Sequence, residues 1–170
     1  MMVKTGAEQR FLKTAKDLLC RELCAVYSDA CFYFFRKTLK TRKGVFYESP
    51  LFPGYVFMKT AVFDPAAVPA LLKRAEGFYH FLPSNSDAAE LSGTDLEYVK
   101  NFSAYGEVLG ASQAYFDENQ RIVITGGPLK GFAGNIIRVN RRTNRVTVRI
   151  DLYGSPKTVD LLYDEVAAEE

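Results

Sequence analysis

The stretch Pro50-Leu51-Phe52-Pro53-Gly54-Tyr55-Val56-Phe57 combines a turn signal with large apolar residues. Its Pro-Gly pair is typical of a tight turn, because proline fixes φ and glycine accepts a positive φ. A strand is predicted over residues 55–58, directly after this turn. Side chains alternate between the two faces of an extended chain, so Pro53, Tyr55 and Phe57 share one face. The opposite face is also apolar, which predicts either a buried strand or a face that meets a partner.

Aromatic residues crowd the sequence around this stretch. Of the 13 Phe and 10 Tyr in the chain, ten lie between residues 27 and 57. One sheet face cannot easily bury that number of rings, so we expect some of them to form an exposed patch. An exposed apolar patch marks a surface for a partner protein.

The chain around this stretch has the pattern of an α+β domain with a mostly antiparallel sheet. A helix over residues 8–23 follows from its apolar period, and a second over 64–75 has Asp64 as its N-cap. The pair Thr94 and Glu97 predicts a capping box that opens a third helix, ending near residue 105. Strands are predicted over residues 26–35 and 78–82, and the cationic run 36–44 is expected to be an exposed loop or hairpin tip.

The C-terminal part of the chain has a different texture, with short β patterns separated by glycine turns. Val146, Val148, Ile150 and Leu152 alternate with polar residues, which predicts a half-buried strand. Four or five such strands in about fifty residues predict a small all-β barrel. We therefore expect an N-terminal domain over residues 1–108, a linker over 109–118 and the barrel over 119–170.

Basic residues are concentrated in two places although the net charge is only +2. Residues 119–150 contain seven basic residues and no acid, and an acidic segment follows. Arginines suit phosphates and base edges, because the planar guanidinium makes paired hydrogen bonds. The predicted RNA-binding residues are Lys130, Arg138, Arg141, Arg142, Arg145 and Arg149. A second basic set is either a solvated loop or a contact to DNA or RNA phosphates, and comprises Arg36, Lys37, Lys40, Arg42 and Lys43.

Several classes of function are not expected from this sequence. The chain has one His and no nucleophile-elbow or HExxH pattern, so we expect no enzyme, cofactor or metal. Cys20, Cys24 and Cys31 with His80 lack zinc-ligand spacing and are expected to be small buried hydrophobes. No stretch reaches the ~18 apolar residues of a membrane helix. Three cysteines without an apolar leader favour free thiols in the cytoplasm.

Two motifs in this order resemble one known family. Residues 50–57 resemble the signature strand of the NusG-like N-terminal domain, and residues 127–139 (Gly-Pro-Leu-Lys-Gly-Phe-Ala-Gly-Asn-Ile-Ile-Arg-Val) resemble a KOW motif. The resemblance covers almost the whole chain. Within the family, the Val3-Lys4-Thr5-Gly6 entry, this version of the signature and the Arg-rich hairpin are similar to the LoaP group of specialised paralogues. The usual Trp-Tyr-Val opening is replaced by Met1-Met2-Val3, so the first strand is expected to be short.

The resemblance implies a transcription elongation factor that acts as a monomer. It implies that the N-terminal domain grips the clamp helices of the RNA polymerase β′ subunit and reaches toward the β subunit, close to upstream DNA. The residues implied in this contact are Phe52, Pro53, Gly54, Tyr55 and Phe57. The LoaP group implies processive antitermination, with the KOW barrel on a hairpin of the nascent RNA. Tyr153 stands where family barrels carry an exposed aromatic that meets Rho or a ribosomal protein.

Three alternatives remain open from the sequence. The chain could be a general NusG-type pausing or termination factor whose barrel binds Rho or a ribosomal protein. It could be an RNA-binding module that does not bind polymerase. A barrel that switches fold, as in the RfaH branch, is disfavoured, because β-branched residues and glycine turns in residues 120–162 oppose a helical state.

Overall fold

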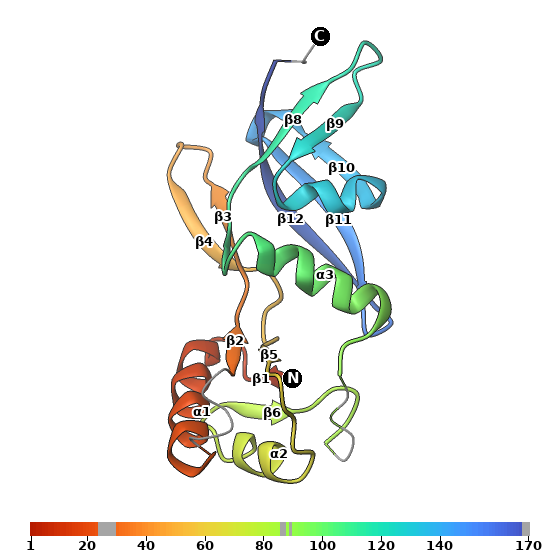
Figure 1. Ribbon diagram of the computed structural model, residues 1–170. Helices are drawn as coiled ribbons and strands as arrows, with labels where there is room; N and C mark the ends of the chain where they lie inside the picture. Colours follow the sequence, from red (N-terminus) through yellow and green to blue (C-terminus); the bar gives the residue numbers. More distant parts are fainter. Residues whose placement is uncertain (24–29, 86–87, 89, 168–170) are drawn as a thin grey trace. The chain divides into compact units, whose positions relative to one another are not determined.

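The computed structural model describes residues 1–23, 30–85, 88 and 90–167, and it has a mixed α+β fold (Figure 1). The chain forms two compact units, each made of segments that are separated in the sequence. Unit 1 comprises residues 1–34 and 52–90, and unit 2 comprises residues 35–51 and 91–170. These two compact units do not coincide with the two domains expected from the sequence, which a linker over residues 109–118 separates. That domain boundary stays a prediction.

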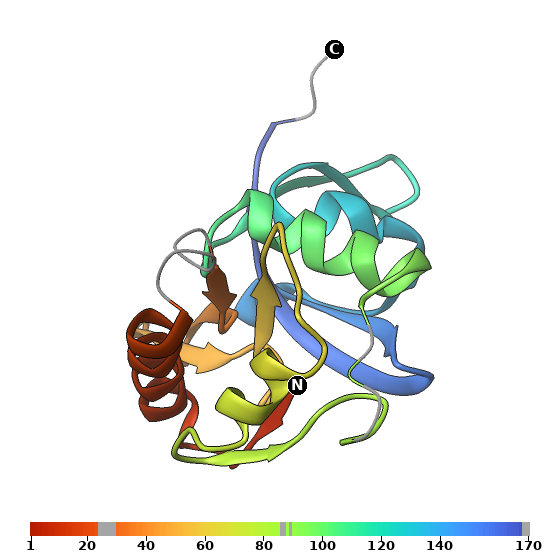
Figure 2. The ribbon, with the colours of Figure 1, turned by 60° about the horizontal axis from the view of Figure 1, so that its bottom comes forward.

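Unit 1 consists of two helices and two small antiparallel strand pairs, β1 with β6 and β2 with β5. Its elements are β1 (Met2–Val3), α1 (Glu8–Leu23), β2 (Cys31–Tyr33), β5 (Phe57–Lys59), α2 (Ala67–Leu72) and β6 (Phe78–His80). The buried face of α1 carries Phe11, Leu12, Ala15 and Leu19, which fall at helical spacing. These side chains pack with residues of α2 and the strands into one apolar core. Figure 2 shows the backbones of α1 and α2 beside the short strands of this unit.

Unit 2 consists of a hairpin, a helix and a five-stranded barrel-like sheet. Its elements are β3 (Arg36–Lys40), β4 (Phe46–Pro50), α3 (Gly93–Ala104), β7 (Val108–Leu109), β8 (Ser112–Phe116), β9 (Ile122–Gly126), η1 (Pro128–Asn135), β10 (Ile136–Asn140), η2 (Arg141–Thr143), β11 (Arg145–Leu152) and β12 (Ser155–Glu165). One sheet has the order β4-β3-β7 and the other β10-β11-β12-β8-β9. Most pairs are antiparallel, as predicted, but β3–β7 and β12–β8 are parallel.

The barrel core is built by alternate residues of β11. Val146, Val148, Ile150 and Leu152 are all fully buried, which confirms the half-buried strand expected from the sequence. Gly127, before η1, has φ +84°, and a Cβ there would lie 2.7 Å from the Cα of Ser112. Only glycine therefore lets the chain pass β8 at this point.

Helix α3 packs on the barrel through aromatic rings. Phe102 stacks on Phe132 of η1 with centroids 4.8 Å apart and planes 12° apart, and Tyr98 also contacts Phe132. The side-chain amide of Asn101 donates to the carbonyl of Pro128 at 3.0 Å. Figures 1 and 2 both show η1 alongside α3. This helix and the barrel therefore share one core.

The helix over residues 8–23 is confirmed as α1, but several local predictions are wrong. The basic run begins as strand β3, because its backbone pairs with both β4 and β7 and Leu39 is buried; only residues 41–45 form the tip. The capping box is wrong: α3 begins at Gly93, and its N-cap Ser92 makes no side-chain bond. The second helix is shorter than predicted, although the carboxylate of Asp64 accepts the N–H groups of residues 66 and 67.

Four further predictions differ from the structure or lie partly outside it. Of the strand predicted over 26–35, residues 31–33 form β2, and 26–29 lie outside the described residues. The strand predicted over 55–58 is β5, which begins at Phe57. Cys20 and Cys31 are exposed rather than buried, and Cys24 lies outside the described residues. Residues 112–116, expected in a linker, form β8 of the barrel sheet.

Candidate functional site

The Pro-Gly turn, residues 52–55, is the first part of the candidate site. The N–H of Tyr55 donates to the carbonyl of Phe52 at 3.1 Å, and Gly54 has φ +77°. Proline at the second position and a positive φ at the third are the marks of a type II turn. A Cβ on Gly54 would lie 3.0 Å from the carbonyl oxygen of Val3, so glycine is also needed for the close approach to β1.

A buried carboxylate holds this turn against the start of α1. Glu8 is 4% exposed, and its Oε1 accepts the N–H of Gly54 at 3.0 Å. Its Oε2 accepts the N–H of Gly6 at 2.7 Å, so both oxygens have a backbone donor. The N–H of Val3 donates to the carbonyl of Gly54 at 2.8 Å. The turn is thereby fixed from both sides, by β1 and by a charge at the first turn of α1.

The aromatic residues of the predicted polymerase contact form a packed cluster. Phe52 makes edge-to-face contacts with Tyr55 and Phe57, each with ring centroids 6.4 Å apart. All three rings are buried, whereas Pro53 is exposed at the turn. The predicted exposed aromatic patch is therefore not on this strand. The cluster supports an exposed Pro-Gly turn from beneath.

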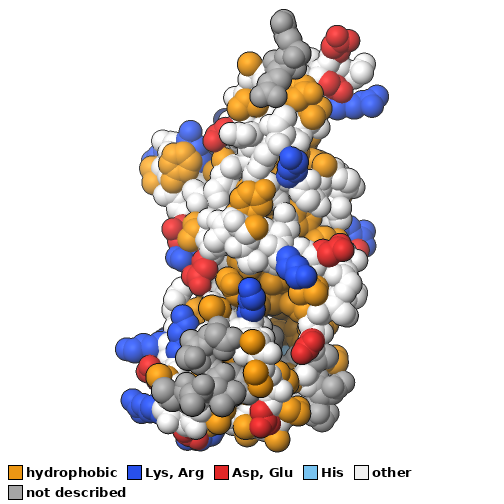
Figure 3. Space-filling view, viewed as in Figure 1, with side chains coloured by type: hydrophobic (Ala, Val, Ile, Leu, Met, Phe, Trp, Pro, Cys, Tyr) orange, Lys and Arg blue, Asp and Glu red, His pale blue; other side chains and the backbone are white. Residues whose placement is uncertain are grey.

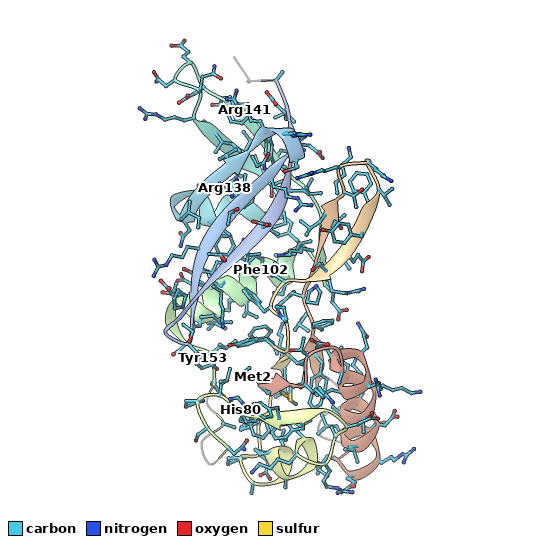
Figure 4. The ribbon with its side chains drawn as sticks, turned by 180° about the vertical axis from the view of Figure 1, so that it is seen from behind. Met2, His80, Phe102, Arg138, Arg141 and Tyr153 are labelled. Atoms are coloured by element: carbon cyan, nitrogen blue, oxygen red, sulfur yellow. The ribbon has the colours of Figure 1, made fainter. Side chains whose placement is uncertain are left out.

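The outer face of the barrel carries the predicted RNA-binding arginines. Arg149 alternates with the buried residues of β11, and Arg138 stands opposite Thr147 in the β10–β11 ladder. Figure 4 shows Arg138 and Arg141 on the barrel. We call the exposed basic residues of this region the arginine face: Lys130, Arg138, Arg141, Arg142 and Arg149.

The η2 turn at the end of β10 orients Arg141. Its guanidinium carbon lies 3.6 Å from the ring centroid of Phe116, and Nη2 donates to Oε1 of Gln120 at 2.8 Å. The carboxamide oxygen of Asn140 accepts the N–H of Thr143, and Asn144 closes the turn in the left-handed conformation. A stacked guanidinium held in one plane suits paired hydrogen bonds to phosphate.

Arg145 has a different role from the other arginines. It is half-buried, and its Nη2 donates to the backbone carbonyl of Lys40 at 2.7 Å. Burial lowers the pKa of Lys37, with an opposing effect of Asp160 and a smaller lowering effect of Arg145. Arg145 therefore joins the basic stretch of the barrel to the basic stretch of the β3–β4 hairpin. From the sequence alone, the two stretches were expected to be separate features. Asp160, which accepts the hydroxyl of Thr147 at 2.6 Å, makes this part of the surface mixed in charge.

The β3–β4 hairpin carries the second predicted basic set. Arg36 forms an ion pair with Glu48, whereas Lys40, Arg42 and Lys43 are exposed. The ammonium group of Lys40 lies 5.2 Å from the ring centroid of Phe46. Phe46 and Tyr47 are the exposed members of the aromatic group between residues 30 and 57, and Tyr27 lies outside the described residues. Hydrophobic surface at this tip lies beside lysine and arginine side chains in Figure 3.

Tyr153, the predicted protein contact, lies at the turn between β11 and β12 and is half-buried. Its N–H donates to the Oδ2 of Asp95 on α3 at 3.2 Å. Burial raises the pKa of its phenol, and the charge of Asp95 adds to this effect. In Figure 4, Tyr153 is labelled below Phe102, at the end of the β11–β12 hairpin.

Sequence reasoning missed Glu8 and Phe46 as site residues. An acidic residue directly after a Gly-Ala turn at a helix start is the signal that could have identified Glu8 as a backbone acceptor. Among residues 1–23, 30–85, 88 and 90–167, no group of three potential metal ligands comes together. The helices in this described part lack the length and apolar character needed to span a bilayer.

Comparisons with known proteins give the same fold and motif. A family model described as the KOW motif matches residues 118–149. The transcription termination/antitermination protein NusG of Rickettsia felis is 24% identical over 168 residues, covering 95% of this chain and 84% of the relative. The Thermus thermophilus protein of the same name is 23% identical, covering 68% of this chain and 66% of the relative. A solved structure on domain interaction in Thermotoga maritima NusG has TM-score 0.57 and 16% identity, covering 95% of this chain and 90% of that one.

The fold and the matched motif define a class: an α+β protein with a KOW barrel in its C-terminal part. The likeness to the NusG proteins extends beyond the barrel over nearly the whole chain. The chain is therefore similar to NusG proteins in sequence and in fold, and it carries the KOW motif.

Proposed function

We propose that this chain is a NusG-type transcription elongation factor, close to the LoaP group, that binds RNA polymerase and promotes processive antitermination. Its role is to bind and reposition partners rather than to catalyse a reaction, and it acts in the cytoplasm as a monomer. The observation that carries the proposal is the arginine face. Arg149 is exposed on β11, whose alternate residues are fully buried, and the other exposed cations lie on β10, η1 and η2. Relatives that match 95% of the chain are transcription termination/antitermination proteins.

The polymerase contact is proposed at the Pro-Gly turn. A helix laid on an apolar surface is a common recognition mode, and its affinity depends on a rigid, preorganised surface. Pro53 is exposed above the packed rings of Phe52, Tyr55 and Phe57, and Glu8 fixes the backbone beneath it. These features suit docking on the β′ clamp helices, with the β subunit and upstream DNA nearby.

The RNA contact is proposed at the arginine face. Phosphate contacts from exposed cations give binding that weakens steeply with salt. Arg141 is oriented by its stack on Phe116, whereas Arg145 serves mainly to join the barrel to β3. A hairpin in the nascent transcript, bound here, would hold the factor close to polymerase and raise its effective concentration. Binding only the closed clamp would then disfavour paused and terminating states by population shift.

The polymerase contact is tested with a purified β′ clamp-helix fragment. We expect the full chain to bind and Pro53→Asp to bind at least tenfold more weakly, because a charge is placed at the centre of an apolar contact. Val62→Asp is the matched control, because Val62 is exposed on the same unit outside the turn. Equal affinity of all three proteins, or no binding by the wild type, would exclude the Pro-Gly turn as the contact.

A second candidate function is a general NusG-type factor whose barrel binds Rho or a ribosomal protein. Tyr153 favours it, because its half-buried ring lies at a turn and retains exposed surface. The double variant Arg141→Glu/Arg142→Glu distinguishes the two. In the RNA-directed factor the variant loses RNA binding, whereas in the general factor it binds its protein partner as the wild type does. RNA binding without any polymerase binding would indicate the plain RNA-binding module.

A further inference from the structure

The tip of the β3–β4 hairpin exposes three large apolar residues in succession. Val45, Phe46 and Tyr47 are 62%, 61% and 42% exposed. The tip has a defined conformation: the N–H of Thr41 donates to the carbonyl of Val45 at 2.8 Å, and the N–H of Gly44 donates to the carbonyl of Thr41 at 3.0 Å. Exposed neighbouring apolar residues on an ordered turn mark a contact surface.

The charges around these residues are almost all positive. Lys40, Arg42 and Lys43 are exposed on the tip, and Glu48 is paired with Arg36. An aromatic ring among uncompensated cations suits a polyanion that also carries flat apolar groups. Single-stranded nucleic acid has this chemistry, because phosphates meet the cations while bases stack on the ring.

The tip is continuous with the arginine face. Lys40 is the cross-strand partner of Phe46, and the carbonyl of Lys40 accepts the guanidinium of Arg145. Arg145 in turn pairs with Asn140, directly before Arg141. The hairpin tip and the η2 turn therefore lie together in unit 2 (Figure 4).

We propose that the hairpin tip binds unpaired RNA nucleotides next to the structured RNA on the arginine face, with Phe46 as the residue on which a base stacks. This inference rests on the proposed function, because it takes the polymer on the arginine face to be RNA. Unpaired bases are the part of an RNA whose flat faces are free for stacking on aromatic side chains. The tip thus prefers a stem with a single-stranded tail to a blunt stem.

The test uses the full chain and two RNA probes at low salt. One is an unpaired oligoadenylate that contains 2-aminopurine, whose fluorescence falls when the base stacks on a ring. The other is an RNA stem-loop, prepared blunt and with an unpaired tail. We expect the wild type to quench the first probe and to bind the tailed stem-loop roughly tenfold more tightly than the blunt one.

Phe46→Ala should abolish the quenching and the advantage of the tail, whereas Phe46→Tyr, which keeps a ring, should retain both. Tyr79→Ala is the matched control, because Tyr79 is an exposed aromatic of unit 1 that is 68% exposed, and it should leave both signals unchanged. Circular dichroism of each variant checks that the fold is intact.

The inference is overturned if Phe46→Ala quenches and binds as the wild type does, or if the tail gives no advantage while the blunt stem still binds. In the second case the proposed RNA contact on the arginine face stands alone. If the wild type binds and quenches the oligoadenylate but binds neither stem-loop, the result contradicts the proposed RNA contact on the arginine face instead. A Phe46→Ala variant that binds RNA normally and polymerase weakly would make the tip a protein contact.

Discussion

The carboxylate of Glu8 and the backbone N–H of Gly54 are 3.0 Å apart in the interior of unit 1, although 46 residues separate them. The other carboxylate oxygen accepts the N–H of Gly6, so a single side chain ties the entry of α1 to the Pro-Gly turn. A buried carboxylate is costly unless donors surround it, and here two backbone groups supply them. The proposed polymerase contact is thus positioned by a residue that does not take part in it.

Glu8→Gln should destabilise the protein by about 1–3 kcal/mol. The glutamine side chain has one oxygen acceptor, so its NH₂ group must face one of the two N–H donors now bound by Glu8. Urea unfolding measures the change. Glu76→Gln is the control, because this exposed carboxylate pairs with Arg10 at the surface and should change stability by less than about 1 kcal/mol. Equal stability of the two variants would contradict the proposed role of Glu8.

Gly54→Ala should cost more than Gly6→Ala, although both glycines have a positive φ. A Cβ on Gly6 meets nothing within 4 Å, so its cost is backbone strain of about 1 kcal/mol. A Cβ on Gly54 meets the carbonyl of Val3 at 3.0 Å, which raises the expected cost to about 2–4 kcal/mol. Thermal unfolding of both variants checks the order, and the reverse order would exclude a close approach of the turn to β1.

Substitutions at two neighbouring residues of β11 should have different effects, one on stability and the other on RNA affinity. Ile150 is fully buried, so Ile150→Ala should destabilise the protein by about 2–5 kcal/mol. Arg149 is exposed, so Arg149→Glu should change stability by less than about 1 kcal/mol while lowering RNA affinity. The salt dependence of RNA binding should also become shallower for Arg149→Glu. Unchanged RNA affinity at low salt would remove Arg149 from the contact.

Asp95→Asn should lower the phenol pKa of Tyr153 toward its ordinary value of 10.0 but not below it, because burial is the larger cause of the raised pKa. A raised phenol pKa means that the fold favours the protonated ring. Its contribution to stability is therefore complete below pH 10 and is lost as the pH rises through the folded pKa. NMR titration of labelled tyrosine measures the shift. An unchanged pKa would show that Asp95 and Tyr153 are not close enough to interact.

Features set by local periodicity were predictable from the sequence. The apolar residues of α1 and the alternation of Val146, Val148 and Ile150 each follow from a repeat that matches one type of element. The β class of the C-terminal part followed from the same alternation and from glycine turns. In these segments the burial of each residue depends mainly on its position in the repeat.

Features set by long-range contacts were not predictable. Local charge predicted an exposed loop or hairpin tip over residues 36–44, but pairing with β4 and β7 makes a strand of residues 36–40. The different role of Arg145 depends on a hydrogen bond to Lys40, which lies 105 residues away. The exposure of Phe46, in contrast to the burial of Phe52, depends on which segments cover each ring. No local pattern in the sequence carries that information.

Single-round transcription by bacterial RNA polymerase through an intrinsic terminator tests the central claim most directly. We expect the protein to co-elute with polymerase and to raise read-through. The variant Pro53→Asp should lose both effects, and Val62→Asp should keep both. Polymerase binding and read-through that are absent for the wild type, or that are unchanged in Pro53→Asp, would contradict the account of this chain as an elongation factor that docks through its Pro-Gly turn.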